Sequence, residues 1–244
     1  MTYCVALKLR RGLVFMSDTR TNAGVDNVSV FRKMHSWCRP GERLITILSA
    51  GNLATTQAVV SILDERTKAP DERVQSLLET PSMFQTAQLV GRTLRETIQQ
   101  NATSGQNADS SFNATFIVGG QILGTPPRLF MVYSEGNFIE SSADTPFFQI
   151  GETKYGKPIL VRVYDEDMSF EDAAKMLMLS FDSTLKANLS VGLPLDLQFY
   201  ETDSLKMGYE TRIGADNEYY GMLSAGWGEA LRQTFSTLPR FERS

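Results

Sequence analysis

The first twenty residues constrain the fold of this chain more than any other stretch. Residues 2–9 alternate between large apolar side chains at odd positions and small or polar side chains at even positions, which is the period of a β-strand. A turn at 10–12, Arg-Arg-Gly, leads into a second, mostly apolar run at 13–20. Because a three-residue loop that ends in a left-handed Gly commonly closes a hairpin, the stretch predicts two antiparallel strands.

This loop length sets the expected register of the hairpin. Cys4 should lie opposite Asp18 and Thr2 opposite Arg20, which places Thr2 and Asp18 on one face of the sheet, one diagonal step apart. The face that carries Thr2 has small neighbours and leaves room beside it. The other face is apolar and should contact a core.

Thr2 is a candidate nucleophile because of its position after Met1. A second residue as small as threonine normally allows the initiator methionine to be removed, which would leave a free amine and a hydroxyl on one residue. Such a residue is a nucleophile with its own base, since an α-amine has a pKa of about 8. The alternative is that Thr2 is an ordinary second residue at the start of a strand.

The single histidine narrows the catalytic chemistry. Any Ser-His-Asp or Cys-His site would have to use His35. The sequence contains no G-x-S-x-G motif, and a packed or surface histidine is the better interpretation. Without a histidine-based site, an amine-based site at Thr2 is favoured.

The two cysteines point to no site of their own. Cys4 and Cys38 form neither a disulfide framework nor a metal-ligand spacing. We interpret them as reduced thiols, with a disulfide as the alternative. The sequence predicts no metal and no cofactor.

Charge and composition exclude several classes of protein. A net charge of -4 and an isoelectric point near 5.2 argue against nucleic acid or an anionic membrane as the main partner. No apolar run approaches the roughly 18 residues of a spanning helix, and the N-terminus begins with a strand pattern instead of a signal peptide. We therefore expect a cytoplasmic protein in which residues 1–244 form a single domain.

The rest of the chain alternates between groups of strands and groups of helices. Beyond the hairpin, strands are expected at 28–33, 44–50, 112–119, 128–134, 137–141, 147–151, 195–200 and 206–213. Helices are expected at 53–63 with Asn52 as N-cap, at 82–100 after a connection bracketed by Pro70 and Pro81, at 170–187 and at 218–238. Helices in two separate groups cannot all cover one face of one sheet. The pattern therefore predicts the α+β class, as a four-layer αββα sandwich of two antiparallel sheets flanked by helices.

Four segments resemble the proteasome β-subunit family of N-terminal nucleophile hydrolases. They are Thr2 at a strand start, Ser17-Asp18-Thr19-Arg20 in place of the family's Asp-Ser-Arg segment, Arg32-Lys33 near its invariant lysine, and 47–52, which is similar to its strand-to-helix Ala-Gly corner. The broader similarity covers most of the chain. It implies the same four-layer sandwich.

The resemblance implies a threonine-type peptidase and a role for each matched residue. It makes the Thr2 hydroxyl the nucleophile and the Thr2 amine its base, while Lys33 holds positive charge beside them. It pairs Asp18 with Lys33 and makes the Gly51 N–H the donor to the oxyanion. From the residues alone, a simple strand-to-helix turn at Gly51 would be the preferred interpretation.

Weaker matches suggest further site residues. Arg20 resembles a supporting residue of the same segment, and Thr21 and Ser49 lie where the family binds peptide backbone and lines its first specificity pocket. The family also has an Asp and a Ser after the third helix that support the threonine amine. Here Ser190 and Asn188 are the candidates for that support, with no clear Asp.

The chain departs from the family pattern in three places. Gly151-Glu152 stands where the family has Gly-Ser, Lys33 comes one residue earlier than usual, and an extension at 188–197 follows the third helix. Together with the lack of a propeptide beyond Met1, these departures resemble a bacterial branch of the family. That branch has the proteasome fold and forms subunit assemblies.

Three hypotheses of function remain open. The first is a threonine endopeptidase that acts on peptide or protein substrates inside a self-compartmentalising homo-oligomer, a ring or a helical assembly, with an ATP-dependent unfoldase as a candidate partner. The second is an amidohydrolase that acts on small amides or on γ-glutamyl or acyl bonds. The third is a catalytically weak scaffold subunit. Neither nucleic acid nor a membrane is expected as a partner.

Overall fold

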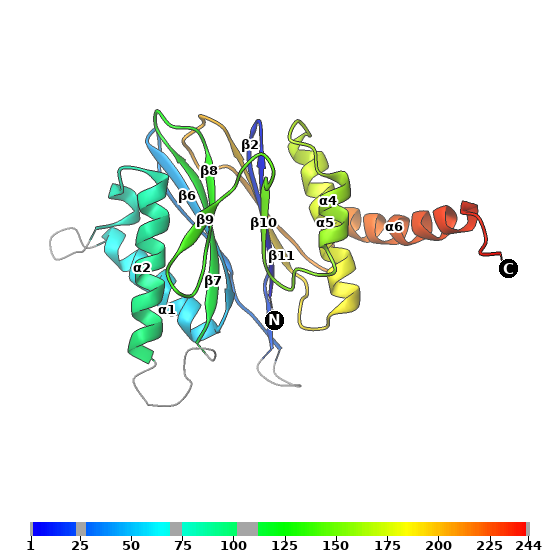
Figure 1. The fold of residues 1–244 in the computed structure, drawn as a ribbon, viewed down its shortest axis with the longest axis horizontal. Helices are drawn as coiled ribbons and strands as arrows, with labels where there is room; N and C mark the ends of the chain where they lie inside the picture. Colours follow the sequence, from blue (N-terminus) through cyan, green and yellow to red (C-terminus); the bar gives the residue numbers. More distant parts are fainter. Residues whose placement is uncertain (1, 23–27, 69–74, 102–111, 243–244) are drawn as a thin grey trace.

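The computed structural model of this chain describes residues 2–22, 28–68, 75–101 and 112–242. Two five-stranded antiparallel sheets are stacked face to face, and helices cover both outer faces (Figure 1). The predicted α+β class and four-layer αββα sandwich are therefore confirmed.

The strands and helices fall into this architecture as follows. The strands are β1 (Tyr3–Leu9), β2 (Gly12–Asp18), β3 (Arg20–Asn22), β4 (Val28–Val30), β5 (Met34–Arg39), β6 (Arg43–Gly51), β7 (Ala114–Ile122), β8 (Arg128–Val132), β9 (Phe138–Glu140), β10 (Phe147–Gly151), β11 (Leu195–Glu201) and β12 (Tyr209–Ile213). The helices are α1 (Leu53–Lys68), α2 (Met83–Asn101), α4 (Lys157–Val163), α5 (Phe170–Ala187) and α6 (Glu218–Thr237), with a 3₁₀ turn η1 (Leu77–Glu79) before α2. The first sheet has the order β10-β1-β2-β11-β12 and the second the order β5-β6-β7-β8-β9, while β3 and β4 form a separate ribbon.

Three apolar layers hold the sandwich together. One lies between the first sheet and the helices α4 and α5, one between the two sheets, and one between the second sheet and the helices α1 and α2. Tyr3, Val5 and Leu7 of β1 belong to the first layer, whereas Cys4 and Ala6 belong to the layer between the sheets. Both faces of β1 are therefore buried, and its small side chains make room for the second sheet.

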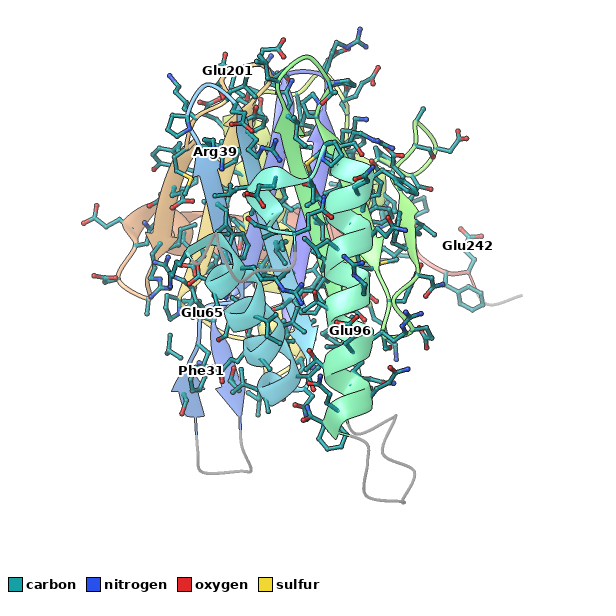
Figure 2. All side chains as sticks on the ribbon, turned by 90° about the vertical axis from the view of Figure 1, so that its left-hand side faces the viewer. Phe31, Arg39, Glu65, Glu96, Glu201 and Glu242 are labelled. Atoms are coloured by element: carbon teal, nitrogen blue, oxygen red, sulfur yellow. The ribbon has the colours of Figure 1, made fainter. Side chains whose placement is uncertain are left out.

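The N-terminus and the β3–β4 ribbon lie at one end of the sandwich (Figure 1). Figure 2 shows α1 and α2 side by side over the second sheet, with Phe31, next to the ribbon, at the opposite end from Arg39 and Glu201. Helix α6 projects away from the sandwich beyond α5 (Figure 1). Across the described ranges, no helix combines the length and the apolar character needed to cross a bilayer.

The hairpin register differs from the prediction by one residue. Cys4 lies opposite Ser17 and not opposite Asp18, because the turn contains two residues, 10 and 11, instead of three. A shift of one residue exchanges the two faces of a strand. The predicted placement of Thr2 opposite Arg20, on one face with Asp18, is therefore also wrong.

Gly12 has a different role from the one predicted. It is paired with Leu9 as a strand residue and does not close the turn. The neighbouring strand β11 passes so close that a Cβ on Gly12 would lie 1.9 Å from the Tyr200 carbonyl oxygen. The glycine is required by this approach of a third strand, which the local sequence does not reveal.

Two predicted elements, β10 and α5, have the predicted bounds, and the others are present with shifted ends, whereas β3, β5, η1 and α4 were missed. β5 has polar residues such as His35 in half-buried positions, which hides its alternation, and α4 has only seven residues. The strand predicted at 28–33 ends at Val30. Pro70, which was expected to bracket the connection before α2, lies outside the described residues.

Gly119 of β7 makes room for Phe15 of β2 across the interface between the sheets. A Cβ on Gly119 would lie 2.7 Å from the Phe15 ring. Gly119→Ala should therefore lower the free energy of unfolding by about 1–3 kcal/mol, the usual effect of overpacking a core, as measured by urea unfolding. In a Phe15→Leu background the same change should have a much smaller effect. Equal losses in both backgrounds would show that the Phe15 ring is not what resists the added methyl group.

Candidate active site

Thr2 lies directly before β1 and is held by the end of β10. Only 8% of the residue is exposed, and its carbonyl oxygen accepts a hydrogen bond from the Glu152 N–H at 2.7 Å. Gly151 has a φ of +83°, and a Cβ there would lie 1.9 Å from the same carbonyl oxygen. A glycine at this position therefore allows β10 to close on the backbone of Thr2.

A buried ion pair begins where the ladder between β1 and β2 ends. The last paired residues are Cys4 and Ser17, and the next amide, the Tyr3 N–H, donates to Oδ1 of Asp18 at 3.0 Å. Nζ of Lys33 donates to the same oxygen at 2.7 Å. The Asp18 carboxylate thus replaces the backbone partner of a strand and also binds a cation, as the family resemblance implies for this pair.

Two further hydrogen bonds fix the pair in place. Nζ of Lys33 also donates to the Arg20 carbonyl oxygen at 2.6 Å, and the Gly192 N–H donates to Oδ2 of Asp18 at 3.4 Å. Burial nevertheless raises the pKa of Asp18, although Lys33 and the N–H groups of Tyr3 and Gly192 act in the opposite direction. Desolvation therefore outweighs the attraction between the charges. A buried ion pair of this kind is poor support for stability and is typical of functional sites.

A cavity of about 420 Å³ opens beside the ion pair. It is lined by Thr2, Thr21, Arg32, Lys33, Ser49, Ala50, Gly51, Leu53, Thr56 and Gly151. Separate segments of the chain therefore bring five of the residues suggested by the sequence into one lining: Thr2, Thr21, Lys33, Ser49 and Gly51. Asp18 is completely buried and reaches this cavity through Lys33.

The backbone around Gly51 is positioned by the end of β6. The Ser49 N–H donates to the Lys33 carbonyl oxygen at 3.0 Å. Alternate N–H groups of a strand point to the same side, so the Gly51 N–H lies on the side of β6 that faces the segment before β5, and Gly51 lines the cavity. The predicted N-cap is confirmed, because Oδ1 of Asn52 accepts from the Thr55 N–H at 3.0 Å. Gly51 therefore stands between a strand that aims its N–H and a helix that begins immediately after it.

The predicted supporting residues lie around the cavity and not in its lining. Arg20 donates from its guanidinium to the Leu189 carbonyl oxygen at 3.1 Å. Nδ2 of Asn188 donates to Oε2 of Glu152 at 3.0 Å, and the Ser190 N–H donates to Oδ1 of Asn188 at 2.9 Å. Glu152, which the sequence marks only as a departure from the family, thus connects the extension after α5 to the strand end beside Thr2.

Of the other five lining residues, Ala50 and Gly151 were noted only as parts of the segments compared with the family, and Arg32, Leu53 and Thr56 were missed. Arg32 was noted only as a neighbour of Lys33, and Leu53 and Thr56 only as helix residues. They reach the cavity because the segment before β5 passes it and α1 begins beside it. The one sequence signal that could have indicated them is their position next to the matched segments, Lys33 and 47–52.

The histidine and the cysteines lie outside the cavity lining. His35 is on β5 opposite Ile47, and burial lowers its pKa, in agreement with a packed histidine. Cys4 and Cys38 are not bridged, and burial raises the pKa of both thiols. These side chains therefore supply no alternative nucleophile at this site.

A threonine at a strand start, beside a buried lysine and inside an αββα sandwich, is the arrangement of proteasome-type N-terminal nucleophile hydrolases. The family model described as "Proteasome subunit" matches residues 2–192, and the chain belongs to this family. A comparison with curated proteins finds no match.

Within the family, the chain is similar to solved structures of Anbu, the bacterial branch that the sequence departures indicate. Anbu (ancestral beta-subunit) from Yersinia bercovieri is 47% identical, with a TM-score of 0.92 and all of both chains covered. Anbu from Hyphomicrobium sp. strain MC1 is 53% identical, with a TM-score of 0.91 over 99% of this chain and 100% of that chain. The Anbu complex from Pseudomonas aeruginosa, a helical assembly, is 43% identical, with a TM-score of 0.93 over 99% of this chain and 98% of that chain.

Removing the lysine alone should leave a buried carboxylate without its cation. Lys33→Met should lower the free energy of unfolding near pH 7 by about 3 kcal/mol or more, because an unpaired buried charge is strongly destabilising. The pKa of Asp18 is raised by folding, so the folded state binds a proton at Asp18 more tightly than the unfolded chain does. Proton binding at Asp18 therefore stabilises the folded state at low pH, and this stabilisation is lost as the pH rises. The loss in Lys33→Met should therefore shrink between about pH 7 and about pH 5, measured by urea unfolding.

The double variant Asp18→Asn, Lys33→Met is the matched control. It removes both charges, so it should recover most of the stability lost in Lys33→Met and should show little dependence on pH over the same range. If Lys33→Met lost the same stability at both pH values, Asp18 would not be the group left unpaired.

Proposed function

We propose that this protein is a threonine-type peptidase in which Thr2, freed from Met1, is both nucleophile and base. One observation carries the proposal. Thr2, Lys33 and Gly51 line the same cavity, and the buried Asp18 carboxylate binds Lys33 from outside the lining. Met1 itself lies outside the described residues, so its removal is part of the proposal.

The reaction proceeds through an acyl-enzyme. The Thr2 hydroxyl oxygen attacks the substrate carbonyl carbon while its proton passes to the Thr2 amine, directly or through water. The carbon–nitrogen bond then breaks, and the amine returns the proton to the leaving nitrogen. Water hydrolyses the resulting ester with the amine again as base, which regenerates the free hydroxyl.

The surrounding residues favour the charges that develop. The Lys33 ammonium lowers the pKa of the nearby hydroxyl and amine by its positive charge, and Asp18 fixes its direction. The Gly51 N–H donates to the oxyanion of the tetrahedral intermediate, a contribution typically worth about 3 kcal/mol. An extended peptide would lie between the segments that carry Thr21 and Ser49.

Support for the nucleophile comes from the segments behind it. Arg20 holds the extension after α5 through Leu189, and Asn188 holds it through Glu152. Ser190 completes this support through its backbone N–H. These contacts keep the backbone of Thr2 in place while its side chain reacts.

The family also supports assembly into a homo-oligomer. The Anbu complex from Pseudomonas aeruginosa is a helical assembly, and we propose that this chain likewise forms a ring or helical compartment in the cytoplasm. An ATP-dependent unfoldase would be its natural supplier of substrate. An amidohydrolase acting on small amides and a weakly active scaffold subunit remain the competing functions.

Electrophilic labelling tests the proposed nucleophile directly. A peptide vinyl sulfone or a β-lactone should form one adduct on the N-terminal peptide that begins with Thr2, located by mass spectrometry. Thr2→Ala should lose the adduct and reduce hydrolysis of casein and fluorogenic peptides by about 10³-fold or more, as loss of a nucleophile does.

Thr2→Ser is the matched control, because it keeps a hydroxyl beside the amine and should retain labelling. Hydrolysis of small amides without peptide hydrolysis would favour the amidohydrolase. Intact mass with Met1 retained and no adduct would favour the scaffold. Unchanged peptide hydrolysis by Thr2→Ala would exclude the mechanism.

A further inference from the structure

The cavity beside Thr2 has positively charged side chains in its lining and no negatively charged ones. The two cations are Arg32 and Lys33. The Lys33 charge is already satisfied by Asp18 and by the Arg20 carbonyl oxygen. Arg32 is exposed and therefore supplies the charge that an incoming ligand would meet.

The acidic side chains on the far side of Arg32 are engaged elsewhere. Arg32 also lines a second cavity, of about 300 Å³, together with Asp196 and Glu210. Asp196 accepts two hydrogen bonds from Arg212, at 2.7 and 3.0 Å, and Glu210 accepts from Gln198 at 2.6 Å. Within the described part of the chain, Arg32 takes part in no ion pair.

A guanidinium that lines a cavity is suited to bind a carboxylate side chain. Its planar array of donors matches a carboxylate with two parallel hydrogen bonds. The substrate side chain nearest Thr2 belongs to the residue whose carbonyl is attacked, and a cavity that contains Thr2 would receive it. Burying that carboxylate near Arg32 would supply the partner that the guanidinium lacks.

We propose that Arg32 makes an acidic residue the preferred one on the acyl side of the bond that is cleaved. The proposal rests on the proposed function, since it assigns the substrate class of that same site. It does not depend on the assembly or on an unfoldase.

Matched peptides test this preference. Fluorogenic tetrapeptides that differ only in the residue before the scissile bond (Glu, Gln, Leu or Lys) should be cleaved with kcat/KM highest for Glu. The nearly isosteric Gln peptide should be at least about tenfold slower, because it lacks the charge that pairs with Arg32. Equal kcat/KM for Glu and Gln would overturn the proposal.

Variants of Arg32 separate its charge from the shape of the cavity. Arg32→Ala should abolish the difference between Glu and Gln, and Arg32→Glu should reverse the preference in favour of Lys. Arg92→Ala removes an exposed arginine of α2 that is outside the cavity lining and should leave the preference unchanged. Thermal melting of each variant shows whether it is folded.

A binding measurement distinguishes failure of this proposal from failure of the proposed function. The Thr2→Ala protein should bind a fluorescent peptide ending in Glu at least about tenfold more tightly than the Gln peptide, by fluorescence anisotropy, and Arg32→Ala should remove that difference. Preferential binding without turnover by the native chain would support Arg32 and reject the peptidase. Turnover without a preference would support the peptidase and reject Arg32.

Discussion

The ion pair between Lys33 and Asp18 is the interaction on which this end of the molecule depends. Asp18 lies where the ladder between β1 and β2 stops, and its two oxygens bind groups from three directions: the Tyr3 N–H, the Lys33 ammonium and the Gly192 N–H. The strand start, the segment after the ribbon and the extension after α5 are therefore positioned by one carboxylate. Thr2 precedes the first of these groups by a single residue, so its position follows from the same contact.

The stability that retains this pair comes from other parts of the fold. Burial raises the pKa of Asp18 in spite of the adjacent cation, which means that folding disfavours the ionised form of this carboxyl group. β1 is buried on both faces between two apolar layers, and β2 pairs with β1 as far as Ser17 and with β11 along its whole length. The burial of these strands offsets the cost of desolvating a charged group at their end, a combination that is common where function and stability conflict.

Much of the fold could be predicted from sequence because its signals are local. The order of strand and helix groups leads to the sandwich, and the apolar repeat of 170–187 gives α5 with the same bounds. The hairpin register could not be obtained in this way, because Gly12 is explained by the approach of Tyr200 and not by the turn itself. β5 was missed for a different reason: it is an edge strand of the second sheet, and its polar residues are only half-buried, which obscures the strand alternation.

The residues of the candidate site also differ in whether a local sequence pattern indicates them. Residues near recognisable motifs were found. Gly151 and Glu152, in contrast, contact Thr2 from the end of the neighbouring strand β10 and are far from it in the sequence, so no local pattern indicates the contact. In sequence, Glu152 is a departure that weakens the match to the family. In three dimensions it is a connection, because its N–H binds the Thr2 carbonyl oxygen and its carboxylate binds Asn188. A residue that had merely lost its function would not be expected to link Thr2, the proposed nucleophile, to the extension after α5, so the departure argues for a different support of the candidate site and against its decay.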